Sequence, residues 1–200
     1  RKNKVSETLQ LVKQLREITG AGMLDCKKYL EQANNNLDEA VKLFRSESGK
    51  KAEKKGSRIA AEGLVNFYQN DDHLLILELN SETDFVAKDN NFIALSESIA
   101  NELLNKQESE AQQSIAEMIN TSISKLGENI KLRRYSLIDK KNYVHAYSHN
   151  NKIVSSVELK HSDESLAKDI CMQIVASNPL AIDELSLDKD ILKAEKDIYK

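Results

Sequence analysis

Two histidines, His145 and His149, are spaced so that they could act together chemically. His145 and His149 lie two positions on either side of Tyr147, so all three share one face if the segment is a strand. Imidazoles that converge from one face can bind a metal ion, but no cysteine lies near them and their spacing matches no standard metal site. We therefore interpret both as surface or interface histidines and predict no metal site.

The two cysteines, Cys26 and Cys171, are the candidate nucleophiles. Cys26 falls on the apolar face of a predicted helix, where a thiol acts by default as a small core side chain. The pair is far apart in the sequence and forms no CxxC motif, which indicates a reducing compartment and excludes a disulfide scaffold. The sequence contains no G-x-S-x-G, H-E-x-x-H or P-loop motif. It therefore favours a binding protein without a cofactor over an enzyme.

A lysine-rich stretch suggests phosphate binding as another chemistry. Residues 46–57 (SESGKKAEKKGS) and the next residue bring together five cations: Lys50, Lys51, Lys54, Lys55 and Arg58. The whole chain nevertheless has a formal net charge of −3, with both signs interspersed, and no aromatic side chains separate these cations. We therefore predict a solvated linker over residues 46–57 and no nucleic-acid partner.

Apolar runs are short throughout the chain. The longest aliphatic run covers residues 74–77, whereas a membrane-spanning helix needs ~20 apolar residues. Glycine occurs 6 times and proline once, which excludes collagen-like and proline-rich classes. The sequence therefore predicts a soluble protein of regular helices and strands, with no membrane partner.

The first of these elements are predicted helices within residues 1–45. Ser6 is a candidate cap for a helix that ends at Gly20, a second helix spans residues 23–33, and Asn36 and Glu39 have capping-box spacing before a third. The apolar side chains at helical spacing are Leu9, Leu11, Val12, Leu15 and Ile18 in the first, Met23, Cys26, Leu30 and Ala33 in the second, and Leu37, Ala40, Val41 and Phe44 in the third. The pattern predicts a three-helix bundle.

The rest of the chain, residues 58–138 and 139–200, uses one pattern twice. Apolar runs on either side of residues 70–72 predict a hairpin, and a helix with Phe92, Leu95, Ile99 and Leu103 on one face follows. A hairpin over residues 143–159 and a helix bearing Leu166, Ile170 and Ile174 repeat this order. Between the repeats lie a predicted helix with apolar positions from 115 to 126 and a strand over 130–137. The predicted fold class is α+β, with antiparallel sheets and helices packed on one face.

Two segments resemble the signatures of the elongation factor Ts family. The first runs from Leu11 to Lys28 and contains TGAGMLDCKK, and the second is SETDFVAK at residues 81–88, followed by Phe92. The resemblance runs from about Val5 to Ile198 and is most specific in the first hundred residues. It implies an N-terminal module of the ubiquitin-associated (UBA-like) type and a core of two related subdomains. It also implies a guanine-nucleotide exchange factor that makes elongation factor Tu release GDP, so that GTP can bind.

The same resemblance implies which residues bind elongation factor Tu. Lys13, Leu15 or its neighbours, and the corner at Gly22 and Met23 are expected to lie where the module meets the GTPase domain. The segment Asp84-Phe85-Val86 is expected at a tip where Asp84 and Phe85 form a wedge that disturbs the Mg²⁺ and phosphate site. Without the resemblance, an acid in a first helical turn and a phenylalanine have ordinary explanations, the helix dipole and the core.

Several points depart from the family or stay open. Many members carry histidine where this chain has Gln173, so no role is carried over to that residue. The resemblance leads us to expect a cut C-terminal end at Lys200, and the missing initial methionine leads us to expect trimming before Arg1. An interaction adaptor that binds ubiquitin-like proteins, and a hydrolase or transferase that uses Cys26 or Cys171, are the alternatives. A bacterial cytoplasm is the expected location, with a mitochondrial matrix or plastid stroma as the alternative.

Overall fold

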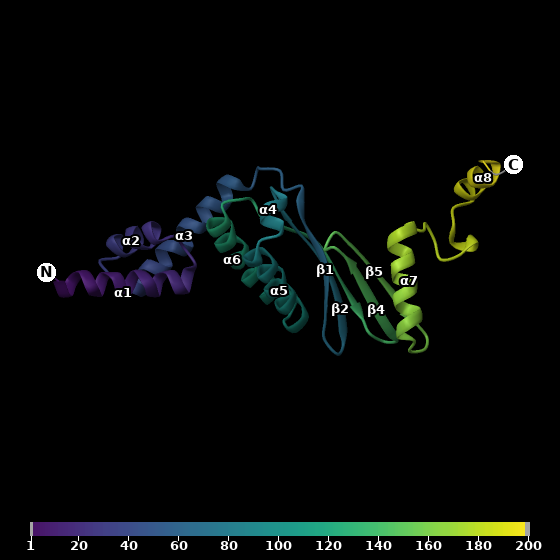
Figure 1. Cartoon of the computed structure of the whole chain (residues 1–200), viewed down its shortest axis with the longest axis horizontal. Coiled ribbons are helices and arrows are strands. Elements are labelled where there is room, and N and C mark those ends of the chain that lie inside the picture. Colours follow the sequence, from purple (N-terminus) through teal and green to yellow (C-terminus); the bar gives the residue numbers. More distant parts are fainter. Residues whose placement is uncertain (1, 199–200) are drawn as a thin grey trace. The chain divides into compact units, whose positions relative to one another are not determined.

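The structure is a computed structural model that describes the backbone of residues 2–198. The chain forms two compact units, Arg1–Asp139 and Lys140–Lys200, and most of their elements are labelled in Figure 1. Among the described residues, no helix is both long enough and apolar enough to cross a membrane.

The first unit begins with the predicted three-helix bundle. Its helices are α1 (Lys2–Thr19), α2 (Met23–Gln32) and α3 (Leu37–Lys55). Leu15, Cys26 and Leu30 are fully buried at its centre, and the rings of Tyr29 and Phe44 meet edge to face at 5.8 Å. The bundle therefore has its own small core.

Some details of the predicted helices are wrong. The backbone of Ser6 lies inside α1, so this residue does not cap the helix. Leu9, Ile18 and Met23 are exposed, because three short helices bury only a narrow stripe of each other and Tyr29 occupies the inner face of α2.

The predicted linker is the largest correction in this unit. Helix α3 continues through Ser46 to Lys55 without a break, so the predicted linker over residues 46–57 is wrong for residues 46–55, and only the last two residues lie in a turn. Its lysines, glutamates and alanine are good helix formers, and Glu47 pairs with Lys50 at 2.8 Å one turn apart. Ala52 is buried in the core of the neighbouring sheet, which holds this end of the helix in place.

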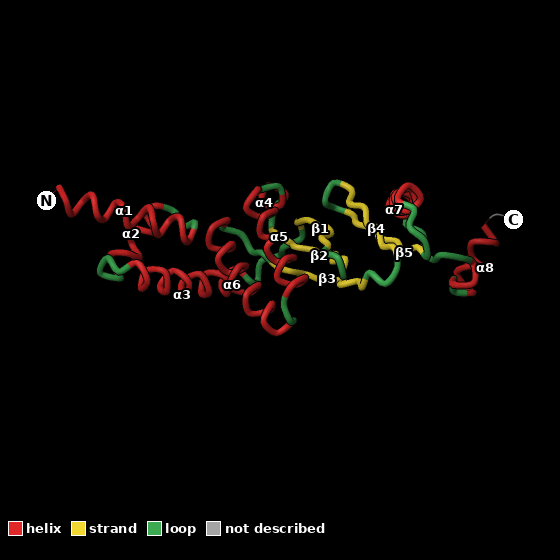
Figure 2. Tube along the Cα trace, turned by 90° about the horizontal axis from the view of Figure 1, so that it is seen from below, coloured by secondary structure: helices red, strands yellow, loops and turns green. Residues whose placement is uncertain are grey.

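That sheet is antiparallel, in the order β1-β2-β3 (Figure 2). Its strands are β1 (Glu62–Gln69), β2 (His73–Ser81) and β3 (Lys131–Asp139). Gly63 has φ +145°, and a Cβ there would lie 2.1 Å from the Leu79 carbonyl oxygen, so glycine permits the close approach of β1 and β2. The first hairpin is confirmed, and the strand predicted over residues 130–137 joins the same sheet.

Helices α4 (Asp84–Ala87), α5 (Asn90–Asn105) and α6 (Glu108–Leu126) accompany this sheet. The predicted inner face of α5 is confirmed, since Phe92, Leu95, Ile99 and Leu103 all lie in one core with three leucines of β2, Leu75, Leu77 and Leu79. Gly127, with φ +82°, ends α6 in the left-handed conformation, and the chain then enters β3.

The second unit repeats the hairpin-and-helix order. It contains β4 (Tyr143–His149), β5 (Ile153–Leu159), α7 (Glu164–Ser177), the 3₁₀ turn η1 (Glu184–Ser186) and α8 (Lys189–Ile198). Asn150 and Asn151 have φ of 53° and 54°, which a tight hairpin turn requires. The predicted inner face of α7 is shifted, because Ala167 and Cys171 are buried while Leu166 is exposed. The mixed fold with antiparallel sheets agrees with the predicted α+β class.

Candidate partner interface

The short helix α4, which follows β2, exposes the aromatic ring of Phe85 to solvent. Helix α4 has only four residues, and the Thr83 hydroxyl oxygen caps it by accepting the Val86 amide hydrogen at 3.4 Å. Ala87 is buried in the sheet core and Val86 packs partly against it, whereas Phe85 on the opposite side is 82% exposed. Phe85 is therefore not a core residue, and it forms the apolar end of a tip comprising residues 82–88.

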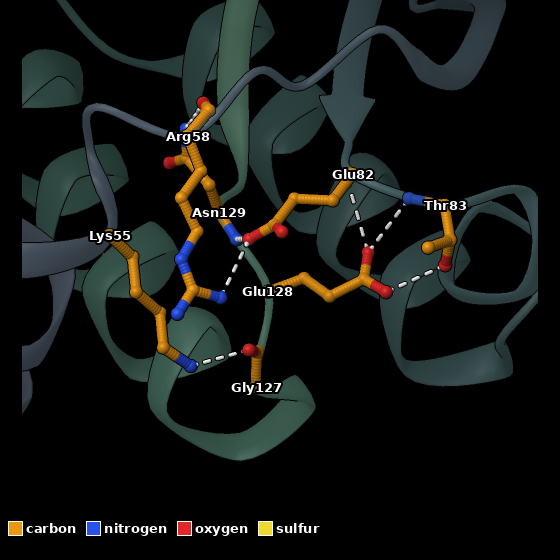
Figure 3. Close-up of polar contacts among 7 residues, drawn as sticks. All are labelled: Lys55, Arg58, Glu82, Thr83, Gly127, Glu128 and Asn129. Atoms are coloured by element: carbon orange, nitrogen blue, oxygen red, sulfur yellow. Dashed lines mark hydrogen bonds and ion pairs between the residues drawn. The ribbon is translucent and has the colours of Figure 1, made fainter.

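A carboxylate from a distant part of the sequence holds the base of this tip. Glu128, in the turn after α6, accepts the backbone amide hydrogens of Glu82 and Thr83 on Oε2 at 3.1 and 3.0 Å (Figure 3). Its Oε1 accepts the hydroxyl hydrogen of Thr83 at 2.6 Å. Two consecutive residues before α4 are thus bound to one anion, which gives the short helix a fixed base.

The same turn is bound to the chain before β1. The Glu82 carboxylate accepts the Asn129 amide hydrogen at 2.6 Å, and the Asn129 side chain donates to the Arg58 carbonyl oxygen at 2.7 Å. The Lys55 ammonium donates to the Gly127 carbonyl oxygen, which anchors the end of α3 (Figure 3). The pKa of Lys55 is lowered, mainly by partial burial and to a smaller extent by the positive charge of Arg58.

Asp84 lies beside the ring in the first turn of α4. Its carboxylate accepts a hydrogen bond from the Lys88 ammonium at 2.7 Å, and this bond raises the pKa of Lys88. Lys88 is exposed and Asp84 is half-exposed, and an ion pair of this kind contributes little to stability because solvent screens its charges. The tip therefore presents an exposed aromatic ring next to a carboxylate that is paired with Lys88.

The residues expected to bind a partner in the helical module do not all reach the surface. Lys13 and Gly22 are exposed, and Met23 is 52% exposed. Leu15, by contrast, is completely buried, so the direct partner contact expected of it is wrong, and it supports α1 from inside. Leu24, which the sequence analysis did not single out, is 84% exposed next to Met23.

Among the described residues, the histidines and cysteines considered as candidates for metal binding and nucleophilic chemistry do not form such a site. Tyr147 lies with its hydroxyl 3.2 Å from His149 Nδ1, and the described residues contain no group of three or more potential ligands placed to hold a metal ion. Cys26 and Cys171 are buried, and burial raises the pKa of each thiol, which disfavours a nucleophilic thiolate. Gln173 is exposed on α7 and donates to the Ser177 hydroxyl oxygen.

Sequence reasoning missed Glu128, the residue that holds the tip. Its separation from Thr83 is 45 positions, so no local periodicity connects the two. The available signal was the glycine before it, which predicts the end of α6 and a turn, but a turn does not reveal what its side chains contact.

Known proteins are similar in sequence to this chain over almost its whole length. Residues 82–200 match the family model for elongation factor TS, and residues 6–51 match a UBA-like domain, which confirms the predicted module. The elongation factor Ts of Clostridium acetobutylicum is 42% identical over 209 residues, covering 94% of this chain and 68% of the relative. That of Thioalkalivibrio sulfidiphilus is 38% identical over 205 residues, covering 96% and 70%, and that of Xanthomonas oryzae pv. oryzae is 41% identical over 201 residues, covering 96% and 69%. With these matches and this fold, the chain belongs to the elongation factor Ts family of translation elongation factors.

Proposed function

We propose that this chain binds elongation factor Tu in its GDP-bound state and promotes the release of GDP, so that GTP can bind, in a bacterial cytoplasm. The observation that carries the proposal is Phe85, a large apolar ring exposed on a backbone that Glu128 holds in place. We further propose that residues 58–138 and 139–200 act as two core subdomains beside the UBA-like module.

Exchange of a nucleotide needs differential binding and no bond chemistry. A Mg²⁺ ion and a phosphate-binding loop hold GDP mainly through charge and backbone amides. A ring that inserts into a groove present only in the displaced state stabilises that state, which is how a partner shifts an equilibrium. Asp84, next to the ring, would bring a negative charge close to the ligands of the ion. Phe85 and Asp84 would thus act together as the wedge.

The helical module would supply a second contact. Lys13, Gly22 and Met23 lie on its surface, with Leu24 adjoining the last two. Two contacts carried by one chain raise the overall affinity, because the second binds at the effective concentration set by the first. In this proposal Leu15 only maintains the shape of the module.

The test is the release of labelled GDP from elongation factor Tu, measured with and without this protein and with the Phe85→Ala variant. Burying a phenylalanine is worth ~1.5–3 kcal/mol, so removing the ring should slow exchange by roughly 10- to 150-fold if all of this energy acts differentially. The fold should not change, because the ring is exposed. Circular dichroism and a melting curve check that point.

Ile182→Ala is the matched control, since Ile182 is an apolar side chain that is 100% exposed in the second unit. It should exchange GDP at the parent rate. An equal rate for Phe85→Ala and the parent protein would remove the wedge role.

The UBA-like match favours one second candidate, an adaptor whose module binds ubiquitin-like proteins. A pull-down in which this protein recovers no elongation factor Tu, at concentrations where another member of the family retains it, would favour the adaptor.

A further inference from the structure

Glu82 and Thr83, between β2 and α4, have backbone amides that form hydrogen bonds within neither element. β2 ends at Ser81 and α4 begins at Asp84, so the amide hydrogens of Glu82 and Thr83 belong to no ladder and no helix. Glu128 accepts both of them on one oxygen and the Thr83 hydroxyl hydrogen on the other. A carboxylate that receives three donors from two adjacent residues fixes the course of that backbone.

Phe85 depends on this backbone for its direction. Its ring is exposed, so packing against its own chain does little to orient it. A helix of four residues is too short to be stable alone and relies on its cap and on the burial of Ala87. The cap residue is Thr83, whose main chain and hydroxyl are both bound to Glu128.

Glu128 is itself well anchored. The preceding Gly127 ends α6 and accepts a hydrogen bond from Lys55, while the following Asn129 is bound to both Glu82 and Arg58 (Figure 3). Ile130, next in the chain, is buried in the sheet core. The carboxylate is therefore presented from a turn that is held on both sides.

We propose that Glu128 is the positioning residue of the tip: it holds residues 82 and 83 and thereby aims Phe85 for insertion into the partner. This inference rests on the proposed exchange function. It assigns Glu128 no contact with elongation factor Tu, so the residue acts through the ring.

The first test is a titration of each variant into elongation factor Tu loaded with labelled GDP. Glu128→Ala should lower the saturating release rate by roughly 5- to 150-fold, because it leaves two amides and a hydroxyl unpaired and frees the tip. The concentration that gives half of the maximal rate should change by less than about threefold, because other surfaces carry most of the affinity. Glu128→Gln keeps one acceptor oxygen for the two amides, and its NH2 group can donate to the Thr83 hydroxyl oxygen, so it should restore most of the rate.

The second test is a double-mutant cycle with Phe85→Ala. If Glu128 acts only by aiming the ring, Glu128→Ala combined with Phe85→Ala should exchange no more slowly than Phe85→Ala alone. Effects that multiply would overturn the inference, as would a Glu128→Ala rate equal to that of the parent. Glu117→Ala, which removes an exposed carboxylate from the middle of α6, is the matched control and should retain the parent rate.

Hydrogen exchange in the free protein separates this inference from the proposed function. Glu128→Ala should lose the protection of the amides of residues 82 and 83, while Glu117→Ala should keep it. Unchanged protection would overturn the positioning role even if the protein is an exchange factor, and a parent protein that does not accelerate GDP release would overturn the exchange function alone. Should circular dichroism show that Glu128→Ala is unfolded, Glu128→Asp carries both measurements, because its carboxylate is one methylene shorter and falls short of the two amides. Lost protection in a folded Glu128→Asp would support the positioning role, and kept protection would overturn it.

Discussion

Phenylalanine occupies two opposite environments in this protein. Phe44 and Phe92 are buried in the cores of the module and of the first sheet, whereas Phe85 lies in solvent. A single exposed apolar side chain is common on protein surfaces and by itself indicates nothing. What distinguishes Phe85 is the backbone beneath it, which is capped by Thr83 and bound by Glu128. Because this backbone is held, binding has to order only the side-chain rotamers of Phe85, which lowers the entropy cost of inserting the ring.

The two thiols provide a test of the enzyme alternative. Cys26 and Cys171 are fully buried, and each thiol lies within weak hydrogen-bond distance of a carbonyl oxygen, 3.6 Å to Ala21 and 3.7 Å to His145. We expect neither to react with an alkylating reagent in the native protein at pH 8, and both to react in urea at the rate of unfolding. Rapid, selective alkylation of one native cysteine, detected by mass spectrometry, would instead support a catalytic thiol.

The pH dependence has a definite sign. Burial raises the folded-state pKa of both thiols above the unfolded value of about 8.5. Their contribution to stability is therefore complete below about pH 8.5 and is lost as the pH rises through the higher folded-state pKa. Urea unfolding between pH 7 and pH 10 should show this loss, and serine at both positions should remove it.

At the scale of elements, α3 joins the module to the sheet as a continuous helix. Its first half packs in the module through Ala40 and Phe44, and its second half reaches the sheet core through Ala52. The Lys55 ammonium then binds the end of α6. The orientation of the module relative to the first sheet is consequently set by a rigid element.

Gly49, in the middle of α3, tests this rigidity. A Cβ at this position would meet no atom within 4 Å, so Gly49→Ala should stabilise the protein by about 1 kcal/mol, as expected for glycine to alanine inside a helix. Gly49→Pro should destabilise it by about 3 kcal/mol or more, because proline removes a helical hydrogen bond and clashes with the preceding turn. A flexible linker would tolerate both changes equally, so identical urea midpoints for the two variants would contradict the helix.

At the scale of the whole molecule, the proposed function imposes reciprocity. If this protein weakens the binding of GDP to elongation factor Tu by some factor, GDP must weaken the binding of this protein by the same factor. Titrating GDP and Mg²⁺ into the preformed complex should therefore drive the two proteins apart, as calorimetry or analytical gel filtration can measure. A complex that saturating nucleotide leaves intact would indicate a scaffold. The same titration with Phe85→Ala should show a smaller coupling, because the ring binds only the displaced state.

The sequence alone determined most of the local structure. The three helices of the module, both hairpins and the inner face of α5 were predicted because periodicity, caps and turn residues act over a few positions. Asn36 and the asparagines at 150 and 151 are examples, since each satisfies or permits the conformation of its own turn. The family signatures also named the segment at residues 84–86 as a candidate site before any geometry was known.

Only the tertiary structure decided the surroundings of the residues in the family motifs and which distant groups meet. Leu15 and Phe85 lie in equally suggestive motifs, yet the bundle buries Leu15, whereas the packing of Ala87 against the sheet turns Phe85 outward. The charged residues 46–55 form part of α3 and not a linker, because Ala52 is buried in the core that other elements of the first unit build. Glu128 and Thr83 are neighbours solely because α6 returns the chain to the end of β2. Contacts of this kind depend on the free energy of burial summed over many residues that are distant in the sequence. A short segment of the sequence therefore cannot predict them.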